Sequence, residues 1–299
     1  MEPAIRAVAL TKRYGRARGV SGLEFDVRRG EVFGFLGPNG AGKTTTIRLL
    51  LDLIRPTGGQ LEVLGVEPRA GGPALRRRIG YLPGDLRLYE SLTGRELLTY
   101  FAALRGADDL GDAPELVERL DVELDRRIGA LSRGNRQKVG LVQALMHRPE
   151  LLILDEPSSG LDPLVQQTFL ELVREAAARG ATVFLSSHAL PEVQEVADRV
   201  AVVREGELVL VDSVEALRAK ARTRVGVTLA EEPPPGAFAL DGVEELRRDG
   251  NRVELAVAGE PDALVKLLAA FHVVALESRE ADLEDVFLGL YGERTTGAR

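Results

Sequence analysis

Short apolar runs and helix-spaced apolar residues alternate along the first two thirds of the chain. The run EVFGFL (31–36) is short and apolar, as a buried parallel strand is, and KTTTIRLLLDLI (43–54) then has helical spacing. The runs LLILDEP (151–157) and ATVFL (181–185) repeat the strand pattern. Strands that alternate with helices predict an α/β fold built around a parallel sheet.

The segment LYESLTGRELLTYFAALRG (88–106) predicts a helix inserted between two of these strands, because its apolar residues recur at helical spacing. Thr93 and Glu96 have the spacing of a capping box, in which each side chain satisfies a backbone N–H at the helix start. We expect this helix to open a helical insertion that covers about residues 88–145.

The chain after residue 220 has a different pattern. RVGVTLAEEPPPG (224–236) alternates apolar and polar residues, as a half-buried strand does, and ends in a proline loop. Asp249 and Gly250 separate two further candidate strands, which is a strong hairpin signal. We therefore expect a core domain at residues 1–220 and a small α+β accessory domain at residues 221–299.

The last part of this accessory domain predicts two helices around one strand. The helices cover 261–271 and 281–292, and the strand covers 272–277. The apolar face of the closing helix would pack within its own domain or dock against another subunit, and it consists of Leu283, Val286, Phe287 and Leu290.

Composition narrows the class of protein. The 299 residues are 44% hydrophobic and 28% charged, which is typical of a folded chain with a real core. The net charge is −7, and no basic cluster indicates a nucleic-acid surface, so we expect no nucleic-acid partner. The absence of cysteine excludes disulfides and cysteine metal sites.

No run reaches the ~18 apolar residues of a membrane span, and the start lacks the apolar segment of a signal peptide. We expect a cytoplasmic chain whose membrane span, if it needs one, belongs to another subunit.

The glycine-rich loop GPNGAGKTT fits the pattern G-x-x-x-x-G-K-[ST] and stands between a predicted strand and a predicted helix. Glycines let the backbone curl closely around an anion, and the amides at the helix start point toward phosphates. A glycine-rich turn with a chance lysine is the alternative, but the flanking strand and helix favour a nucleotide site. Lys43 would reach the β- and γ-phosphates, and Thr44 would bind Mg²⁺. The whole loop is expected to contact the nucleotide, which the resemblance described below implies is ATP, through Gly37, Pro38, Asn39, Gly40, Ala41, Gly42, Lys43, Thr44 and Thr45.

Two acids follow the apolar run that ends at residue 154. This strand would lie in the same parallel sheet, so its end meets the phosphate loop. Asp155 is then placed to hold Mg²⁺, and Glu156 to polarise the attacking water as a general base. Acids at strand ends often only cap the next turn, but two of them beside a phosphate loop favour the catalytic interpretation.

Between these anchors, LSRGNRQKVGLVQALMHRPE (131–150) resembles the ATP-binding subunits of ABC transporters. Ser132 and Gly134 match the LSGGQ signature, whereas Arg133 and Asn135 depart from it. A serine at a helix start suits a phosphate. On its own Ser132 would be an ordinary N-cap, but its place about twenty residues before the acidic pair favours function.

Three further motifs extend this resemblance. SSGLDP (158–163) matches the D-loop, which implies that Asp162 meets an opposing subunit. LSSH (185–188) supplies His188, which matches the family's switch histidine and can donate a hydrogen bond to a γ-phosphate. LTKRYG (10–15) matches the A-loop, so Tyr14 either stacks on adenine or remains a surface residue.

The resemblance implies a RecA-like P-loop NTPase core with an antiparallel β subdomain and a helical insertion. It also implies that ATP and Mg²⁺ lie between two head-to-tail subunits, either identical or related, and that a separate integral-membrane permease is driven at the inner face of the membrane. The ending DLEDVFLGLYG is similar to the tail of drug- and polyketide-exporter ATPases. The alternative is a non-transport ABC ATPase that acts on ribosomes or DNA. One cassette without sustained heptads or a basic tract counts against that alternative.

The chain departs from the family where a glutamine usually follows GY-x-P. Gly84 occupies that position and Asp85 follows it. Either Asp85 or a water replaces the missing ligand, or the loop couples mechanically and leaves the metal to Thr44 and Asp155. Leu88, Tyr89 and Leu92 are candidates for contact with the permease, with packing inside the insertion as the alternative.

Overall fold

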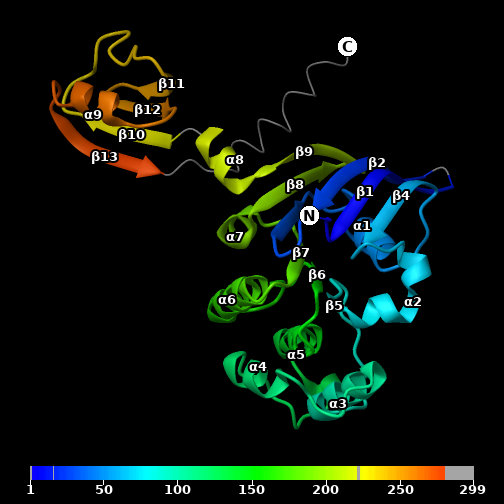
Figure 1. Ribbon diagram of the computed structural model, residues 1–299. Helices are drawn as coiled ribbons and strands as arrows, with labels where there is room; N and C mark the ends of the chain where they lie inside the picture. The colour runs from blue at the N-terminus through cyan, green and yellow to red at the C-terminus, as the bar shows by residue number, and fades with distance from the viewer. Residues whose placement is uncertain (1, 16, 221–222, 280–299) are drawn as a thin grey trace. The chain divides into compact units, whose positions relative to one another are not determined.

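The computed structural model describes residues 2–15, 17–220 and 223–279 (Figure 1). The chain divides into two compact units, Met1–Asp212 and Ser213 onward. The helix α8 (Val214–Lys220) thus belongs to the second unit, whereas the sequence pattern placed the boundary after residue 220. Periodicity identifies a helix but not the unit against which it packs, which explains the difference.

The central sheet of the first unit has six strands in the order β5-β6-β7-β3-β8-β9 (Figure 1). Their bounds are β3 Val32–Leu36, β5 Ile79–Leu82, β6 Leu151–Asp155, β7 Thr182–Ser187, β8 Arg199–Arg204 and β9 Glu207–Ser213. The first five strands in this order run parallel, and every residue of β3, β6 and β7 is buried. Parallel strands end at the same edge of a sheet, so the loops after β3, β6 and β7 meet there.

Helices connect the strands of this sheet. Their bounds are α1 Lys43–Leu50, α2 Pro68–Arg77, α5 Arg133–Leu145, α6 Pro163–Ala178 and α7 Leu190–Val196. The prediction of a helix over 43–54 was wrong at its end. Asp52 adopts a left-handed backbone with φ of 54°, which a right-handed helix cannot continue.

A three-stranded antiparallel sheet packs against the central sheet through a shared aromatic core. Its order is β2-β1-β4, with bounds β1 Ile5–Tyr14, β2 Ala17–Val27 and β4 Gly58–Val63. Phe25 of β2 contacts Phe33, Phe35 and Phe184 of the central sheet, with ring centroids 5.7 to 6.3 Å apart. This is the antiparallel β subdomain that the resemblance implied, and its core also includes Ile47 of α1.

The helical insertion consists of α3 (Gly94–Arg105), α4 (Ala113–Arg119), a 3-10 turn at Ile128–Ala130, and α5. The Thr93 capping box is confirmed, because Thr93 accepts from the Glu96 N–H while the Glu96 carboxylate accepts from the Thr93 N–H. A separate apolar core holds the insertion together and is formed by Leu97, Ile128, Leu131 and Val139, with Leu88, Leu92, Phe101 and Val122 packed around it.

Within its described residues, the second unit has a four-stranded antiparallel sheet in the order β11-β12-β10-β13, and the helix α9 in addition to α8. The bounds are β10 Thr223–Leu229, β11 Val243–Asp249, β12 Arg252–Val257, α9 Asp262–Leu268 and β13 Val273–Arg279. The predicted hairpin is confirmed, with Gly250 at φ 58° in its turn. The expected closing helix at 281–292, with Leu283, Val286, Phe287 and Leu290, lies outside the described residues.

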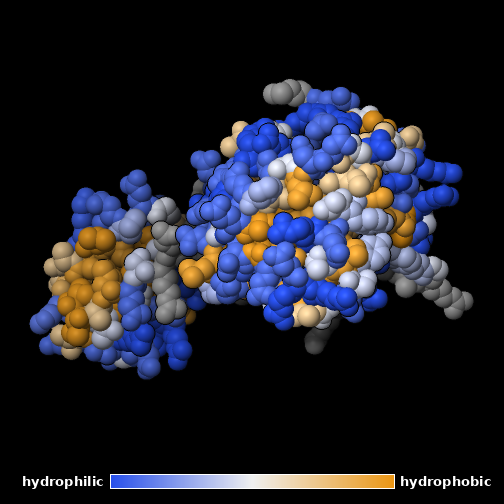
Figure 2. Space-filling model, turned by 90° about the horizontal axis from the view of Figure 1, so that it is seen from below, coloured by the Kyte–Doolittle hydropathy of each residue, from blue (hydrophilic) through white to orange (hydrophobic). Residues whose placement is uncertain are grey.

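Apolar side chains gather on the face of this second unit that Figure 2 shows. Its large exposed apolar residues are Leu246, Val265, Val274 and Leu276. Its buried core lies between the sheet and α9 and contains Val227, Leu255 and Leu264. In the part of the chain that the structure describes, no helix has both the length and the apolar character needed to cross a membrane.

Candidate nucleotide-binding site

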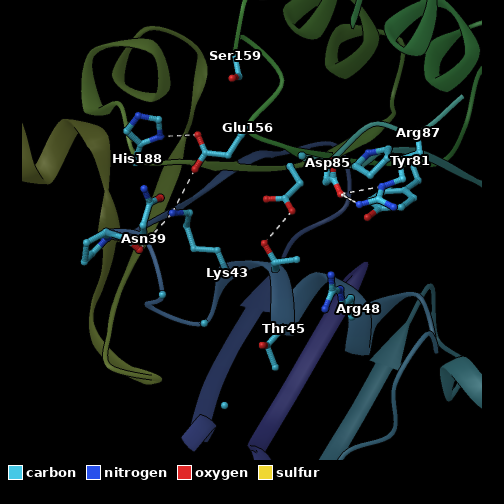
Figure 3. A pocket seen from close by; sticks show the side chains of 18 of the residues that line it. Asn39, Lys43, Thr45, Arg48, Tyr81, Asp85, Arg87, Glu156, Ser159 and His188 are labelled. Atoms are coloured by element: carbon cyan, nitrogen blue, oxygen red, sulfur yellow. Dashed lines mark hydrogen bonds and ion pairs between the residues drawn. The ribbon is translucent and has the colours of Figure 1, made fainter. Parts of the chain in front are cut away.

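A cavity of about 880 Å³ lies at the edge of the central sheet where its parallel strands end (Figure 3). The loop after β3, the ends of β5 and β6, the residue after β7 and the end of β1 all contribute to its lining. Residues expected from the sequence that line it are Tyr14, Pro38, Asn39, Gly40, Gly42, Lys43, Thr44, Thr45, Gly84, Asp85, Asp155, Glu156 and His188. Elements far apart in the chain thus bring most of the expected ATP-binding residues together.

The glycines of the loop are required by the backbone. Gly40 and Gly42 adopt φ of 81° and 111°, which side chains disfavour. A Cβ at Gly37 would lie 2.3 Å from the Val203 carbonyl oxygen, closer than any side chain can approach. Gly37 and Ala41 do not line the cavity but fix the loop, since Ala41 donates its N–H to the Pro38 carbonyl.

The helix α1 begins at Lys43 and points its amino end at the cavity. Its first turn contains no acidic side chain, so its N–H groups and dipole favour an anion. Lys43 is buried, with 6% of its side chain exposed, and donates to the Gly37 carbonyl oxygen at 2.6 Å. Its Nζ also lies 3.2 Å from Oε1 of Glu156. A buried ammonium at a helix start is a strong site for a phosphate.

Oxygen atoms from three elements converge at the end of β6. The Thr44 hydroxyl donates to Oδ2 of Asp155 at 3.0 Å, and the Ser186 hydroxyl donates to Oδ1 at 2.7 Å. Asp155 is 2% exposed, so these hydrogen bonds fix its carboxylate. Among the residues described, no cluster of three or more His, Asp or Glu side chains could enclose a metal. One carboxylate and one hydroxyl fit Mg²⁺, which takes few protein oxygens and shares the rest with phosphates and water.

Glu156 and His188 form a close pair, with Oε2 2.6 Å from Nδ1 (Figure 3). The second carboxylate oxygen, Oε1, is buried and accepts no hydrogen bond from any residue that the structure describes. Lys43 lies near this oxygen as an ion-pair partner, outside hydrogen-bond geometry. A buried carboxylate oxygen with remaining acceptor capacity is what a general base needs.

Tyr14 lies at the rim of the cavity with 44% of its surface exposed. Its ring rests on Gly19, where an added Cβ would lie 3.0 Å from the ring carbon Cε2. The Lys12 ammonium lies 5.4 Å from the ring centroid. An exposed ring held in place over a glycine suits stacking on a base.

Besides Gly37 and Ala41, three residues expected to contact ATP lie outside this cavity. Ser132 caps α5, because its hydroxyl accepts from the Asn135 N–H at 3.2 Å. Gly134 lies against the backbone of Gly160. Asp162 caps α6 by accepting from two N–H groups of its first turn. In one copy of the chain, these residues do not join the loop after β3.

The departure at Gly84 places backbone where a side chain was expected. A Cβ at this position would lie 3.4 Å from Oδ2 of Asp155, so a longer residue here would reach that carboxylate. Asp85 instead pairs with Arg87 at 3.0 Å, and 81% of the Asp85 side chain is exposed. Its carboxylate is therefore already bound by a guanidinium in solvent.

Sequence reasoning missed several residues that line the cavity, namely Gly19, Arg48, Tyr81, Pro83, Arg87 and Ser159. Arg48 follows Thr44 by four residues in α1, so helical spacing could have identified it. Tyr81 is half-buried, and burial together with the Asp155 charge raises the pKa of its phenol to about 12. The sequence of its short strand does not indicate that Tyr81 lies near Asp155.

Comparison with known proteins agrees with this geometry. A family model described as ABC transporter matches residues 20–159. A fluoroquinolones export ATP-binding protein of Mycobacterium tuberculosis is 38% identical, over 98% of this chain and 94% of its own length. A bacitracin transport ATP-binding protein of Bacillus licheniformis is 35% identical, over 99% and 100%. A solved ATP-binding subunit of an ABC transporter superposes with a TM-score of 0.69 at 31% identity, over 73% of this chain and 92% of its own. With relatives matched along nearly its whole length, this chain belongs to the ATP-binding subunits of ABC transporters.

Proposed function

We propose that this chain hydrolyses ATP to drive an exporter whose membrane-spanning part is a separate permease. The observation that carries the proposal is the position of Glu156 between Lys43 and His188, at the edge where the phosphate loop and the strand ends meet. The names of the two relatives state export and transport, which supports a transporter, and from the first an exporter, over an ATPase of ribosomes or DNA.

The residues of the cavity divide the work of binding. Tyr14 would stack on the adenine, and the loop amides with Lys43 would hold the β- and γ-phosphates. Thr44 and Asp155 would hold Mg²⁺, which when bound neutralises charge that develops on the phosphates. Asp155 is fixed for this role by Ser186, and Asp85 is bound by Arg87. We therefore assign metal binding to Thr44 and Asp155.

Glu156 would act as the general base. Its Oε1 accepts a proton from a water whose oxygen attacks the γ-phosphorus, while the bond from that phosphorus to the bridging oxygen breaks, leaving ADP and phosphate. His188 holds the other carboxylate oxygen at 2.6 Å and so orients the base. The histidine is 61% exposed, so it can also turn toward a γ-phosphate.

The working unit would be a head-to-tail pair, formed by two copies of this chain or by this chain and a related subunit. Ser132, Gly134 and Asp162 lie outside the cavity of their own copy. Each would instead reach the nucleotide of a facing copy, where the N-terminus of α5 meets the phosphates.

The permease would contact the helical insertion. Leu88 and Leu92 pack against the insertion core, whereas Tyr89 is 55% exposed and contacts the ring of Tyr100 edge-on. Of the three residues expected from the sequence, Tyr89 is thus the one that is exposed enough to contact a permease. Through this contact the chain would sit at the inner face of the membrane.

Replacing Glu156 with glutamine tests the proposal. The amide keeps the shape of the side chain and removes its basicity, so steady-state ATP turnover should fall by about 10²–10⁴-fold. ATP binding, measured with a fluorescent analogue, should remain, and an ATP-held dimer should accumulate on size exclusion. Unchanged turnover would show that another group activates the water.

A further inference from the structure

Glu156 has a strained backbone. Its φ of 50° lies in the left-handed region, where a Cβ crowds the following carbonyl. Such a conformation persists only when its surroundings hold it in place. The contacts of its own side chain, with Lys43 and His188, hold the carboxylate but leave the chain after it to be fixed by other groups.

The three residues after Glu156 are each tied to a different side chain. The Pro157 carbonyl accepts from the Gln137 amide at 2.9 Å. The Ser158 hydroxyl donates to Oε2 of Glu192 at 2.5 Å, and the Ser159 hydroxyl accepts from the Arg133 guanidinium at 2.9 Å. Two of these ties come from α5 and one from α7, so the segment is held from both sides.

The hydrogen bond between Ser158 and Glu192 joins the segment after Glu156 to the first turn of α7 through a buried serine. Ser158 is 8% exposed, and the hydrogen bond is short and joins a hydroxyl to a carboxylate, a charge-assisted pair. Glu192 lies in the first turn of α7, four residues after His188. The bond therefore joins the segment that follows the base to the helix that follows its histidine.

We infer that Glu192, acting through Ser158, is a positioning residue that keeps Glu156 in its left-handed conformation and at hydrogen-bond distance from His188. This inference rests on the proposed role of Glu156 as the base. Without the tie, the backbone at 156 would relax toward an unstrained φ and carry the carboxylate away from the cavity. Displacements of about 1 Å at a reacting group cost on the order of 10²-fold in rate.

A kinetic test uses Ser158→Ala and Glu192→Gln in the full chain. Each should lower kcat for ATP by about 10- to 100-fold and change KM by less than about twofold, because the base moves and the nucleotide contacts stay. The double variant should be no slower than the slower single, since the two residues act as one unit. Ser158→Thr, which keeps the hydroxyl, should recover most of the rate.

Glu195→Gln is the matched control. Glu195 lies on the same helix and pairs with Arg174 at the surface, so its loss should leave kcat unchanged. If Ser158→Ala and Glu192→Gln both turn over at the wild-type rate, or if they slow the reaction additively, the positioning role is wrong.

A second test does not depend on catalysis. Glycine tolerates a left-handed φ better than alanine, so Glu156→Gly should melt above Glu156→Ala by about 2 °C. In the Ser158→Ala background this gap should shrink, because the backbone is free to relax in both variants. The comparison between backgrounds cancels the effect of glycine on the unfolded chain.

A gap that stays the same in both backgrounds would overturn the inference even if Glu156 is the base. If Glu156→Gln retains full turnover while the gap shrinks as expected, the proposed chemistry fails and the structural tie stands. The two measurements thus separate failure of the inference from failure of the proposed function.

Discussion

The two sheets of this protein place their charged and polar side chains in different ways. In the parallel sheet of the first unit, β3, β6 and β7 are buried along their whole length, and polar groups occur where the strands end. In the antiparallel sheet of the second unit, side chains alternate, so charges spread along one face. There Arg224 pairs with Glu254 at 3.4 Å and Arg252 with Glu277 at 4.0 Å.

The difference shows how the ends of parallel strands can gather polar side chains at one place. Convergent strand ends bring Asp155, Glu156 and Ser186 to one place, where burial strengthens their electrostatic interactions. The pairs on the antiparallel face are exposed, and such pairs contribute about 0–1 kcal/mol each. Their charges neutralise one another, in one pair between the neighbouring β10 and β12 and in the other across β10, from β12 to β13. The fold of the second unit thus disperses polar groups that the first unit concentrates.

The largest expected effect is a difference in ATP affinity between alanine variants of two lysines, one in each unit. Lys43→Ala should weaken ATP binding by about 10³-fold, because a buried ammonium makes charge-assisted contacts with phosphates worth several kcal/mol in total. Lys266→Ala is the matched control, since Lys266 is 76% exposed and pairs with Asp262 within α9. Isothermal titration with ATP measures both. Equal affinities would remove Lys43 from the phosphate site.

A core substitution in the second unit should affect stability and leave nucleotide binding intact. Leu255 is fully buried between the sheet and α9, so Leu255→Ala should lower the free energy of unfolding of this unit by about 3 kcal/mol. Scanning calorimetry of the full chain would follow its transition, and ATP affinity would be measured on the same sample. A parallel loss of ATP affinity would show that the units depend on each other for binding.

The first unit should also show a pH dependence from a buried histidine. Burial, together with the charge of Arg105, lowers the pKa of His147 to about 4. The unfolded chain binds a proton near pH 6.5 and the folded chain only near pH 4, so stability is complete above pH 6.5 and falls as pH drops toward 4. Between pH 7 and 4, His147→Gln should remove about 2 kcal/mol of this loss. Denaturant titrations at several pH values measure the free energy of unfolding, with His272→Gln, a change at an exposed histidine, as control. If this free energy depends on pH equally in the wild type and in both variants, the assignment to His147 is wrong.

The smallest expected effect concerns Asp85. Its carboxylate is exposed and bound to Arg87, so Asp85→Ala should change the Mg²⁺ concentration for half-maximal ATPase activity by less than about twofold. Asp155→Ala should raise that concentration strongly or abolish activity. A comparable shift in the two variants would return Asp85 to the metal site.

Local patterns made most of the cassette predictable. Continuous apolar runs identified β3, β6 and β7, and capping rules placed the starts of α3 and α5. The end of α1 was not predictable, because it depends on a single left-handed residue, Asp52. The apolar residues beyond that point continue the helical spacing even though the backbone does not.

Contacts between side chains are the part of the site that the sequence could not predict. Arg87 pairs with Asp85 because of the conformations of their two side chains on one loop. Those conformations cannot be read from the residue types at the two positions. Ser158 and Glu192 are 34 residues apart, and their bond exists only once the ends of β6 and β7 lie side by side. The residues proposed to carry chemistry were visible in motifs, whereas the residues proposed to orient them were not.

The hydroxyl of Ser132 illustrates how one atom can serve two structures at once. Its lone pair accepts the Asn135 N–H and so caps the start of α5, and a hydroxyl that accepts can still offer its own hydrogen to a second acceptor. Aspartate caps the start of a helix about as well as serine, but a carboxylate has no hydrogen to give and would repel a phosphate. With a phosphate as that second acceptor, this position would discriminate serine from aspartate, which helix stability alone would treat as interchangeable.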